Sequence, residues 1–274
     1  MRGRPCRPGR PRAFRWVATG VGSLAKLVID GVSQGFGPVD VLEDIDLVVE
    51  SGQVACLLGP SGCGKTTLFH VVAGLAAPRA GRVSLDGRDI TGRPGQLAYM
   101  LQKDLLLPHK TILDNVSLPL VLKGVPRDGA REEASDMLAL FGLDGTGDRW
   151  PAELSGGMRQ RAALLRSYLF SREFMLLDEP FSALDAFTKA DMHAWFLDVV
   201  ETCGTTALLV THDIDEAVKL ADVIYVMRGA PQQGEPARIV GSEPVSRPRS
   251  ERDGFALTPE FLEHKRRVLD LLGR

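Results

Sequence analysis

The segment at residues 59–67 constrains the fold more than any other part of the chain. It reads Gly-Pro-Ser-Gly-Cys-Gly-Lys-Thr-Thr, which matches a glycine, four residues, a glycine, a lysine and a hydroxyl residue. The apolar run at 54–58 predicts a buried strand before this segment, and residues 68–75 predict a helix after it. A strand, a glycine-rich loop and a helix in this order predict a phosphate-binding loop in an α/β fold.

The residue types of this loop suit a nucleoside triphosphate. Glycine lets successive backbone N–H groups turn toward phosphate oxygens, and the start of a helix adds its positive dipole end. We expect Lys65 to reach the β and γ phosphates, the hydroxyl of Thr66 to bind Mg²⁺, and Thr67 to donate to an inner phosphate. The alternative is a glycine-rich turn that matches by chance. The candidate nucleotide-binding residues of the loop are Gly59, Pro60, Ser61, Gly62, Cys63, Gly64, Lys65, Thr66 and Thr67.

The charge distribution separates the first residues from the rest of the chain. The whole chain has 33 Lys and Arg against 35 Asp and Glu, but residues 1–15 hold six arginines and no acid. The remainder is therefore acidic and has no basic surplus for nucleic acid. Residues 1–23 are expected to form a disordered basic arm, because they have little apolar area to bury.

Cysteine content and hydropathy point to a compartment and exclude a membrane span. The cysteines at positions 6, 56, 63 and 203 form no C-x-x-C pair, which favours a reducing cytoplasm. No apolar run approaches the ~18 residues of a spanning helix, and no apolar stretch follows the first arginines as in a secretory signal. A role at a membrane would therefore require partner subunits.

The rest of the chain alternates predicted strands with helical segments. Strands are predicted at 24–29 and 41–49, with Phe36 in the loop between them, and Asp86-Gly87 predicts a hairpin in an antiparallel flank. A strand at 97–101 ends at Gln102, and residues 103–170 have the helical pattern of an inserted subdomain. We expect one domain over residues 24–240 and a tail over 241–274, whose final helix at 259–272 has an apolar stripe of Phe261, Leu262, Val268, Leu269 and Leu272.

Polar side chains follow two further strands, predicted at 174–178 and 205–210. Asp178 and Glu179 come at the end of the first, and His212 follows the second. Apolar runs of this kind are typical of central parallel strands, whose carboxyl ends meet at the ligand-binding edge of the sheet. A carboxylate there can hold the magnesium shell. The alternative for Glu179 is a helix-capping or ion-paired surface acid, and the other histidines are expected to be structural.

Residues 154–161 read Leu-Ser-Gly-Gly-Met-Arg-Gln-Arg and resemble the signature segment of the ATP-binding cassette ATPases. Six motifs of that family stand in order over about residues 24–230: the phosphate loop, Gln102, the signature, the Asp178-Glu179 pair, the segment 182–185 that ends at Asp185, and His212. The resemblance implies a P-loop NTPase (RecA-like) α/β fold, with a mostly parallel sheet, an antiparallel β flank and an inserted α-helical subdomain. It also implies ATP hydrolysis with ATP and Mg²⁺ as cofactors.

The resemblance assigns roles to the matched residues. It implies that Asp178 supports Mg²⁺, that Glu179 polarises the attacking water, and that Gln102 contacts metal and water. His212 would hold the γ-phosphate, together with Lys65 as a catalytic group. Phe36 resembles the aromatic residue that stacks on adenine, with a core phenylalanine as the alternative.

Assembly also follows from the resemblance. Ser155, Gly156 and Gly157, at the start of a helix, would form a second anion site that closes on the γ-phosphate held by another copy, and Asp185 would lie at the same interface. This implies a homodimer bound to membrane permease subunits at the cytoplasmic face of the bacterial inner membrane, served by a solute-binding protein, with no nucleic acid partner. The apolar residues at 105–108 are a candidate contact with the permease, or alternatively part of the subdomain's own core.

The subfamily implied is that of importers for nitrate, sulfonates, taurine and similar small solutes. Residues 101–108 resemble most the branch linked with pyrimidine precursors of thiamine, and the chain departs from these relatives at His109, where tryptophan is usual, and at Ser167, where alanine is usual. Three alternatives remain open. An exporter subunit would use the same ATPase residues, whereas a soluble cassette acting on nucleic acid or ribosomes and a P-loop kinase or GTPase explain the motifs less well.

Overall fold

The computed structural model describes residues 26–273, so the expected arm at 1–23 lies outside the described residues. Ten strands within this range form one mixed sheet. The strands are β1 (Leu27–Phe36), β2 (Val39–Val49), β3 (Val54–Leu58), β4 (Ala80–Leu85), β5 (Arg88–Asp89), β6 (Ala98–Met100), β7 (Phe174–Asp178), β8 (Thr206–Thr211), β9 (Val223–Ala230) and β10 (Glu235–Pro244). Their order across the sheet is β5-β4-β1-β2-β10-β9-β3-β8-β7-β6.

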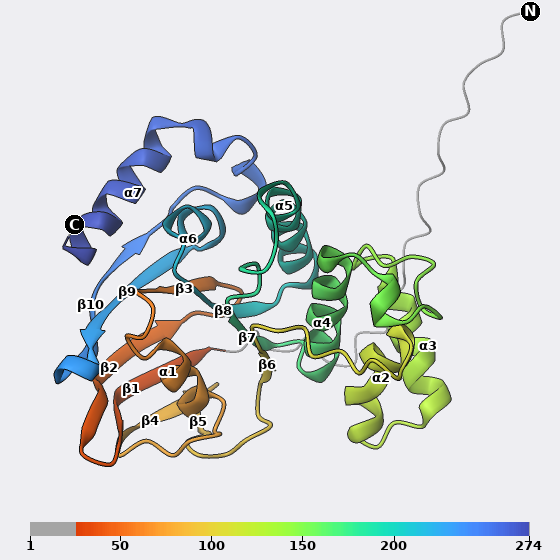
Figure 1. The fold of residues 1–274 in the computed structure, drawn as a ribbon, viewed down its shortest axis with the longest axis horizontal. Coiled ribbons are helices and arrows are strands. Elements are labelled where there is room, and N and C mark those ends of the chain that lie inside the picture. The colour runs from red at the N-terminus through yellow and green to blue at the C-terminus, as the bar shows by residue number, and fades with distance from the viewer. Residues whose placement is uncertain (1–25, 274) are drawn as a thin grey trace, which may run out of the picture.

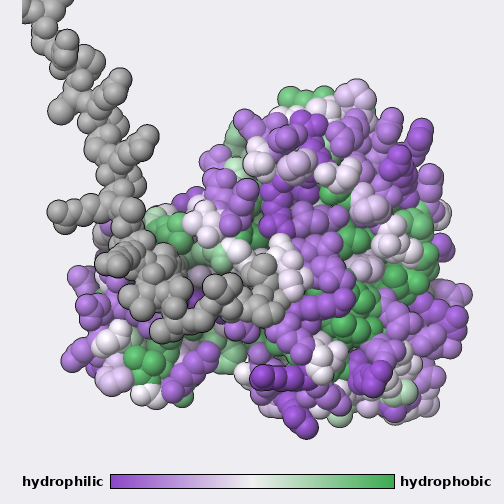
Figure 2. All heavy atoms as spheres, turned by 180° about the vertical axis from the view of Figure 1, so that it is seen from behind, coloured by the Kyte–Doolittle hydropathy of each residue, from purple (hydrophilic) through white to green (hydrophobic). Residues whose placement is uncertain are grey.

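Helices cover this sheet and form a lobe beside it (Figure 1). They are α1 (Lys65–Val72), α2 (Ile112–Leu122), α3 (Arg127–Leu138), α4 (Gly156–Phe170), α5 (Ala186–Cys203), α6 (Ile214–Leu220) and α7 (Pro259–Leu272). Across residues 26–273, none of the helices combines the length and the apolar character that crossing a bilayer requires. On the face shown in Figure 2, hydrophilic residues surround scattered hydrophobic patches.

The parallel strands β9, β3, β8, β7 and β6 form the centre of the molecule. Every residue of β3, β7 and β8 is buried, because the sheet is covered on both faces. Alternate residues of β3 contribute to two separate cores. Cys56 and Leu58 pack with the cluster that includes α4 to α7, and Ala55 and Leu57 pack with α1 and the antiparallel strands. Figure 1 shows α1 on one side of these strands and α5, α6 and α7 on the other.

The inserted subdomain lies between β6 and β7 in the chain and contains α2, α3 and α4. Its helices lie within the helical insertion expected at 103–170, and residues 101–111 before α2 form neither helix nor strand. Asn115 of α2 is fully buried and fixes this irregular segment, since its side chain accepts from the N–H of Leu107 at 2.6 Å and donates to the carbonyls of Leu107, Lys110 and Thr111. Leu106 is held in the core and Leu105 is left exposed.

The antiparallel flank consists of β1, β2, β4 and β5. Its β4–β5 hairpin turns at Asp86 and Gly87 as predicted, and both residues have positive φ angles, 50° and 73°. The parallel core, the antiparallel flank and the helical lobe together confirm the expected fold class.

Two details of the expected strands and helices are wrong. The first strand does not stop near residue 29 but continues to Phe36, which pairs with Val39, so Phe36 ends β1 instead of lying in a loop. In α7, Leu262 is exposed and His264 is buried, because His264 lies three residues after the buried Phe261 and its Nδ1 atom is 2.6 Å from Oε1 of Glu243. A helix face thus closes over a paired polar side chain.

The chain after β9 is bound to the start of β3. Strand β10 crosses residue 240, where we expected the ATPase domain to end. Beyond it, Arg249 and Arg252 both form ion pairs with Asp222, whose Oδ2 also accepts from the N–H of Val54 at 2.9 Å. Arg249 additionally donates to the carbonyl of Gly52 at 2.7 Å. We call this group of contacts the Asp222 cluster.

Candidate functional site

The phosphate-binding loop connects β3 to α1 and forms one wall of a cavity of about 380 Å³. The carboxylates at the end of β7 form the facing wall. The lining residues are Val39, Val41, Ser61, Gly62, Gly64, Lys65, Thr66, Thr67, Asp178, Glu179, Val210, Pro231 and Gln232. The cavity therefore brings together the loop and the two acids that the sequence predicted for nucleotide binding.

Glycine is required in this loop by its backbone and by close packing. Gly62 and Gly64 have φ angles of 81° and 113°, a region that side chains disfavour, and a Cβ atom at Gly64 would lie 2.9 Å from Val41 Cγ1. Lys65 is buried, and its ammonium donates to the carbonyls of Gly59 and Pro60 at 2.8 and 2.9 Å. These contacts leave the third N–H of the ammonium for another acceptor.

Cys63 has a structural place in the loop. Its side chain is buried beneath the loop, where a Cβ atom at Gly59 would lie 3.0 Å from its Sγ atom. Burial raises the pKa of the Cys63 thiol, with Lys65 acting in the opposite direction. A buried neutral thiol of this kind is not a reactive nucleophile.

Asp178 and Glu179 differ in their surroundings although they are neighbours. Asp178 is buried at the end of β7 and accepts a hydrogen bond from the hydroxyl of Tyr99 at 3.3 Å. Burial raises the pKa of its carboxyl group, against the lowering effect of the Tyr99 hydrogen bond. Glu179 has a positive φ of 46°, and its N–H donates to the carbonyl of Val210. Such a strained backbone at a non-glycine residue is a feature of functional sites.

Two residues from distant parts of the chain contact the carboxylate of Glu179. Gln102 donates through Nε2 to Glu179 Oε2 at 3.2 Å, and His212 Nδ1 lies 3.0 Å from Glu179 Oε1. Gln102 Nε2 also lies 3.4 Å from Ser182 Oγ. Each carboxylate oxygen of Glu179 therefore has one side-chain partner, which fixes its direction at the edge of the phosphate cavity.

The remaining predicted residues lie outside this cavity as residues 26–273 describe it. Phe36, at the end of β1, is 60% exposed and does not line the cavity. Val39 and Val41 of β2 form that part of the cavity wall. Gln102 and His212 do not line the cavity themselves, but each contacts Glu179, which does. The sequence analysis did not identify Tyr99. It is the central residue of β6, which pairs with β7, so its position in a strand next to Asp178 was a signal that could have found it.

The signature segment begins α4. Ser155 caps this helix by accepting from the N–H of Met158 at 3.3 Å, and Gly156 and Gly157 are the first helical residues. Asp185 caps α5 in the same way, accepting from the N–H groups of Phe187 and Thr188 at 3.1 Å. The two helix starts are in contact, since a Cβ atom at Gly157 would lie 3.1 Å from Thr188 Cγ2. Neither start lines the phosphate cavity of its own chain.

The fold and the cavity define a nucleoside triphosphate-binding protein of the P-loop class. Comparison with known proteins then gives the family. The family model described as "ABC transporter" matches residues 42–182, which is more than half of the chain. The chain belongs to this family, as one of its ATP-binding cassette ATPases.

Curated relatives agree with this family. The chain is 42% identical over 246 residues to the aliphatic sulfonates import ATP-binding protein SsuB of Albidiferax ferrireducens, covering 89% of this chain and 82% of the relative. It is 41% identical to the sulfate/thiosulfate import ATP-binding protein CysA of Synechococcus elongatus, covering 77% of this chain. The Fe(3+) ions import ATP-binding protein FbpC of Brucella abortus is also 41% identical. The chain spans 63% of the length of CysA and 61% of that of FbpC.

Solved structures have the same fold. A dimeric structure of a post-hydrolysis state of the ATP-binding cassette MJ0796, bound to ADP and Pi, matches with a TM-score of 0.67 and 26% identity, covering 81% of this chain and 99% of that chain. The ATP-binding cassette MJ1267 matches with a TM-score of 0.69 and 23% identity, covering 87% of this chain and 97% of that one.

Proposed function

We propose that this chain hydrolyses ATP to drive a membrane importer of a small organic or inorganic solute. The observation that carries the proposal is the position of Glu179, at the edge of the phosphate cavity and held on both oxygens by Gln102 and His212. A carboxylate fixed in this way can orient a water molecule for attack on the γ-phosphorus and accept its proton. The new bond joins the water oxygen to the γ-phosphorus, the bond from that phosphorus to the β–γ bridging oxygen of ATP breaks, and ADP departs with that oxygen, leaving inorganic phosphate.

The loop residues bind the nucleotide in this proposal. Backbone N–H groups at Gly62 and Gly64 face the phosphates, and the ammonium of Lys65 offers its remaining N–H to the β and γ oxygens. Thr66 and Asp178 line the same cavity with a hydroxyl and a carboxylate, the hard oxygen donors that suit Mg²⁺. Mg²⁺ would neutralise the charge of the phosphates there, with Gln102 as a further ligand. Phe36 is the proposed adenine contact.

Two copies work together in this proposal. Ser155, Gly156 and Gly157 form a helix start whose free N–H groups attract an anion, yet they are absent from the phosphate cavity of their own chain among residues 26–273. A head-to-tail pair would place this helix start on the γ-phosphate held by the other copy. The dimeric MJ0796 cassette supports two cassettes acting as a pair.

An apolar groove is the proposed site of the membrane permease. It has a volume of about 410 Å³ and lies between the sheet domain and the helical lobe. Leu75 and Leu97 contribute to one side, and Leu105, Leu118 and Leu122 to the other. Leu105 is 52% exposed and has a positive φ of 44°, so the chain holds an apolar side chain at the groove in a strained conformation. In this proposal the chain lies at the cytoplasmic face of the inner membrane, where the permease would receive solute from a solute-binding protein.

Import is favoured over export because SsuB, CysA and FbpC are each named as import ATP-binding proteins. The solute classes that follow from these relatives and from the motifs are sulfonates and taurine, sulfate, nitrate, Fe(III) and a pyrimidine precursor of thiamine. The acidic balance of residues 16–274 supports a partner other than nucleic acid.

The test is reconstitution with the membrane protein that purifies with the tagged chain. Proteoliposomes holding both proteins, with ATP on the side of this chain, should move one of these solutes toward the ATP side. Leu105→Asp should abolish co-purification and transport, whereas Leu140→Asp, at a 38% exposed leucine outside the groove, should preserve both. Transport away from the ATP side would refute import, and co-purification of Leu105→Asp at the normal level would refute the groove.

A further inference from the structure

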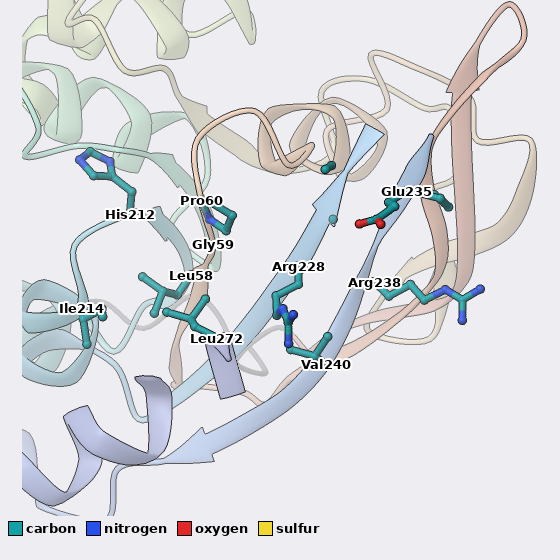
Figure 3. Close-up of a pocket in the computed structure, with 13 residues that line it drawn as sticks. Leu58, Gly59, Pro60, His212, Ile214, Arg228, Glu235, Arg238, Val240 and Leu272 are labelled. Atoms are coloured by element: carbon teal, nitrogen blue, oxygen red, sulfur yellow. The ribbon is translucent and has the colours of Figure 1, made fainter. Parts of the chain in front are cut away.

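A second cavity lies beside the phosphate-binding loop. It has a volume of about 430 Å³ and is lined by Gly59, Pro60 and His212, together with residues of β9, β10, α6 and α7. We call it the hairpin hollow. Figure 3 shows Leu58, Ile214 and Leu272 grouped on one side of it, with Arg228 and Val240 on the other. Its apolar side chains can pack against a ring that enters from outside, and its charged part, formed by Arg228, Glu235 and Arg238, offers guanidinium groups that can lie against the face of such a ring.

A large exposed side chain is available on another part of the same molecule. Phe187, in the first turn of α5, is 88% exposed. The residues before it, from Ser182 to Ala186, are also largely exposed, so the ring stands on an open ridge. A phenylalanine ring has a large apolar area, and covering it with a partner would remove that area from water.

We propose that Phe187 of each copy seats in the hairpin hollow of the other copy when two copies close on ATP. This inference rests on the head-to-tail pair proposed above. Phe187 is next to Thr188, which contacts Gly157, and Leu184 lies within 3.8 Å of a Cβ atom placed at Gly156. The ridge and the signature helix therefore approach the partner as one surface.

The hollow lies where that surface arrives. The signature segment closes on the partner's phosphate-binding loop, and Gly59 and Pro60 of that loop line the hollow. A two-fold axis then makes the contact twice, with the ring of each copy entering the hollow of the other. His212 lines the hollow and Glu179 lines the phosphate cavity. Because these two side chains are in contact, they connect the two cavities.

Seating the ring there would affect the catalytic groups of the partner. The carbonyls of Gly59 and Pro60 hold Lys65, and His212 holds Glu179. A ring against Pro60 and His212 therefore packs on both supports of the phosphate cavity. Phe187 is a positioning residue in this scheme, because it acts through Pro60 and His212 and touches no reacting atom.

The experiment measures ATP-driven dimerisation in a Glu179→Gln background, where hydrolysis cannot remove the nucleotide. Sedimentation velocity over a range of protein concentrations gives the dimer dissociation constant. We expect Phe187→Ala to raise it at least tenfold, Phe187→Leu to restore most of the affinity, and ATP binding by the monomer to stay unchanged in each variant. Leu122→Ala is the matched control, at a leucine that is 77% exposed on the helical lobe.

Cross-linking tests the partner site directly. A chain with both Phe187→Cys and Val240→Cys should form a disulfide between copies when ATP is added, and each single variant should not. Cys56 and Cys63 are buried, whereas Cys203 is only partly buried and Cys6 lies outside the described residues, so Cys6 and Cys203 are replaced by serine in all of these variants. An unchanged dissociation constant for Phe187→Ala would refute the contact and leave the hollow to another occupant, such as a small anionic effector. Absence of any ATP-driven dimer in the Glu179→Gln parent would instead refute the head-to-tail pair of the proposed function.

Discussion

Replacing Glu179 by glutamine should nearly abolish ATP turnover while leaving ATP binding intact. The structure explains why the replacement keeps its shape. The amide oxygen can still accept from Gln102, which lies 3.2 Å from Oε2, and the amide nitrogen can donate to His212 Nδ1, 3.0 Å from Oε1, if that ring changes tautomer. Both contacts survive, and the basic carboxylate is lost.

The size of the effect follows from the role of the lost group. A positioned general base contributes about 10²–10⁴-fold to a rate, which corresponds to about 3–5 kcal/mol of transition-state stabilisation. Asp178 remains to support Mg²⁺, and Lys65 remains on the phosphates, so the dissociation constant for ATP should change less than about threefold, or ~0.7 kcal/mol. The variant should therefore accumulate with bound ATP.

The assay is phosphate release by the purified chain, with ATP affinity measured separately by calorimetric titration. Glu201→Gln is the matched control, because it removes the charge of an exposed glutamate on α5 and should leave turnover unchanged. A Glu179→Gln rate within about fivefold of the unmodified rate would refute the assignment of Glu179 as the group that activates water.

Three further results are expected. Lys65→Ala should weaken ATP binding itself by at least about tenfold, because the buried ammonium faces the phosphates. An ATP affinity equal to that of the unmodified chain in a calorimetric titration would contradict the role of the phosphate-binding loop. Leu106→Asp should lower the melting temperature by about ten degrees or more, because an unpaired carboxylate would enter the core, whereas Leu105→Asp should melt within a few degrees of the unmodified chain. Deleting residues 1–15 should leave melting and ATPase activity unchanged, because an arginine-, proline- and glycine-rich segment has little apolar area to bury; a large loss of either would contradict this.

Much of the fold could be predicted because its signals are local. The phosphate loop, the hairpin at Asp86-Gly87 and the buried strand that ends at Asp178 each show a recognisable pattern within about ten residues. The choice between Leu105 and Leu106 could not be predicted. The segment around them is irregular, so it has no periodicity, and its direction is set by the hydrogen bonds of Asn115.

The sequence predicted which residues belong to the candidate site, but it did not predict the hydrogen bonds between them. Gln102, Glu179 and His212 follow three separate strands, and nothing in the sequence says that the first and last would both bind the carboxylate of the second. Phe36 was misplaced because a tight turn at Gly37-Pro38 lets β1 continue to its end. Leu262 was misplaced because a buried hydrogen-bond contact between His264 and Glu243 turns a polar face of α7 inward.

The Asp222 cluster gives the phosphate-binding loop a remote anchor. Strand β3 runs directly into that loop, and its first residue, Val54, is tied to Asp222, which Arg249 and Arg252 hold in turn. Arg249 also binds Gly52, 197 positions earlier in the chain. A displacement of the tail would thus be transmitted along the short, fully buried strand β3 to the phosphate-binding loop. The tail beyond β10 is mechanically coupled to the nucleotide site, although none of its described side chains lines the phosphate cavity.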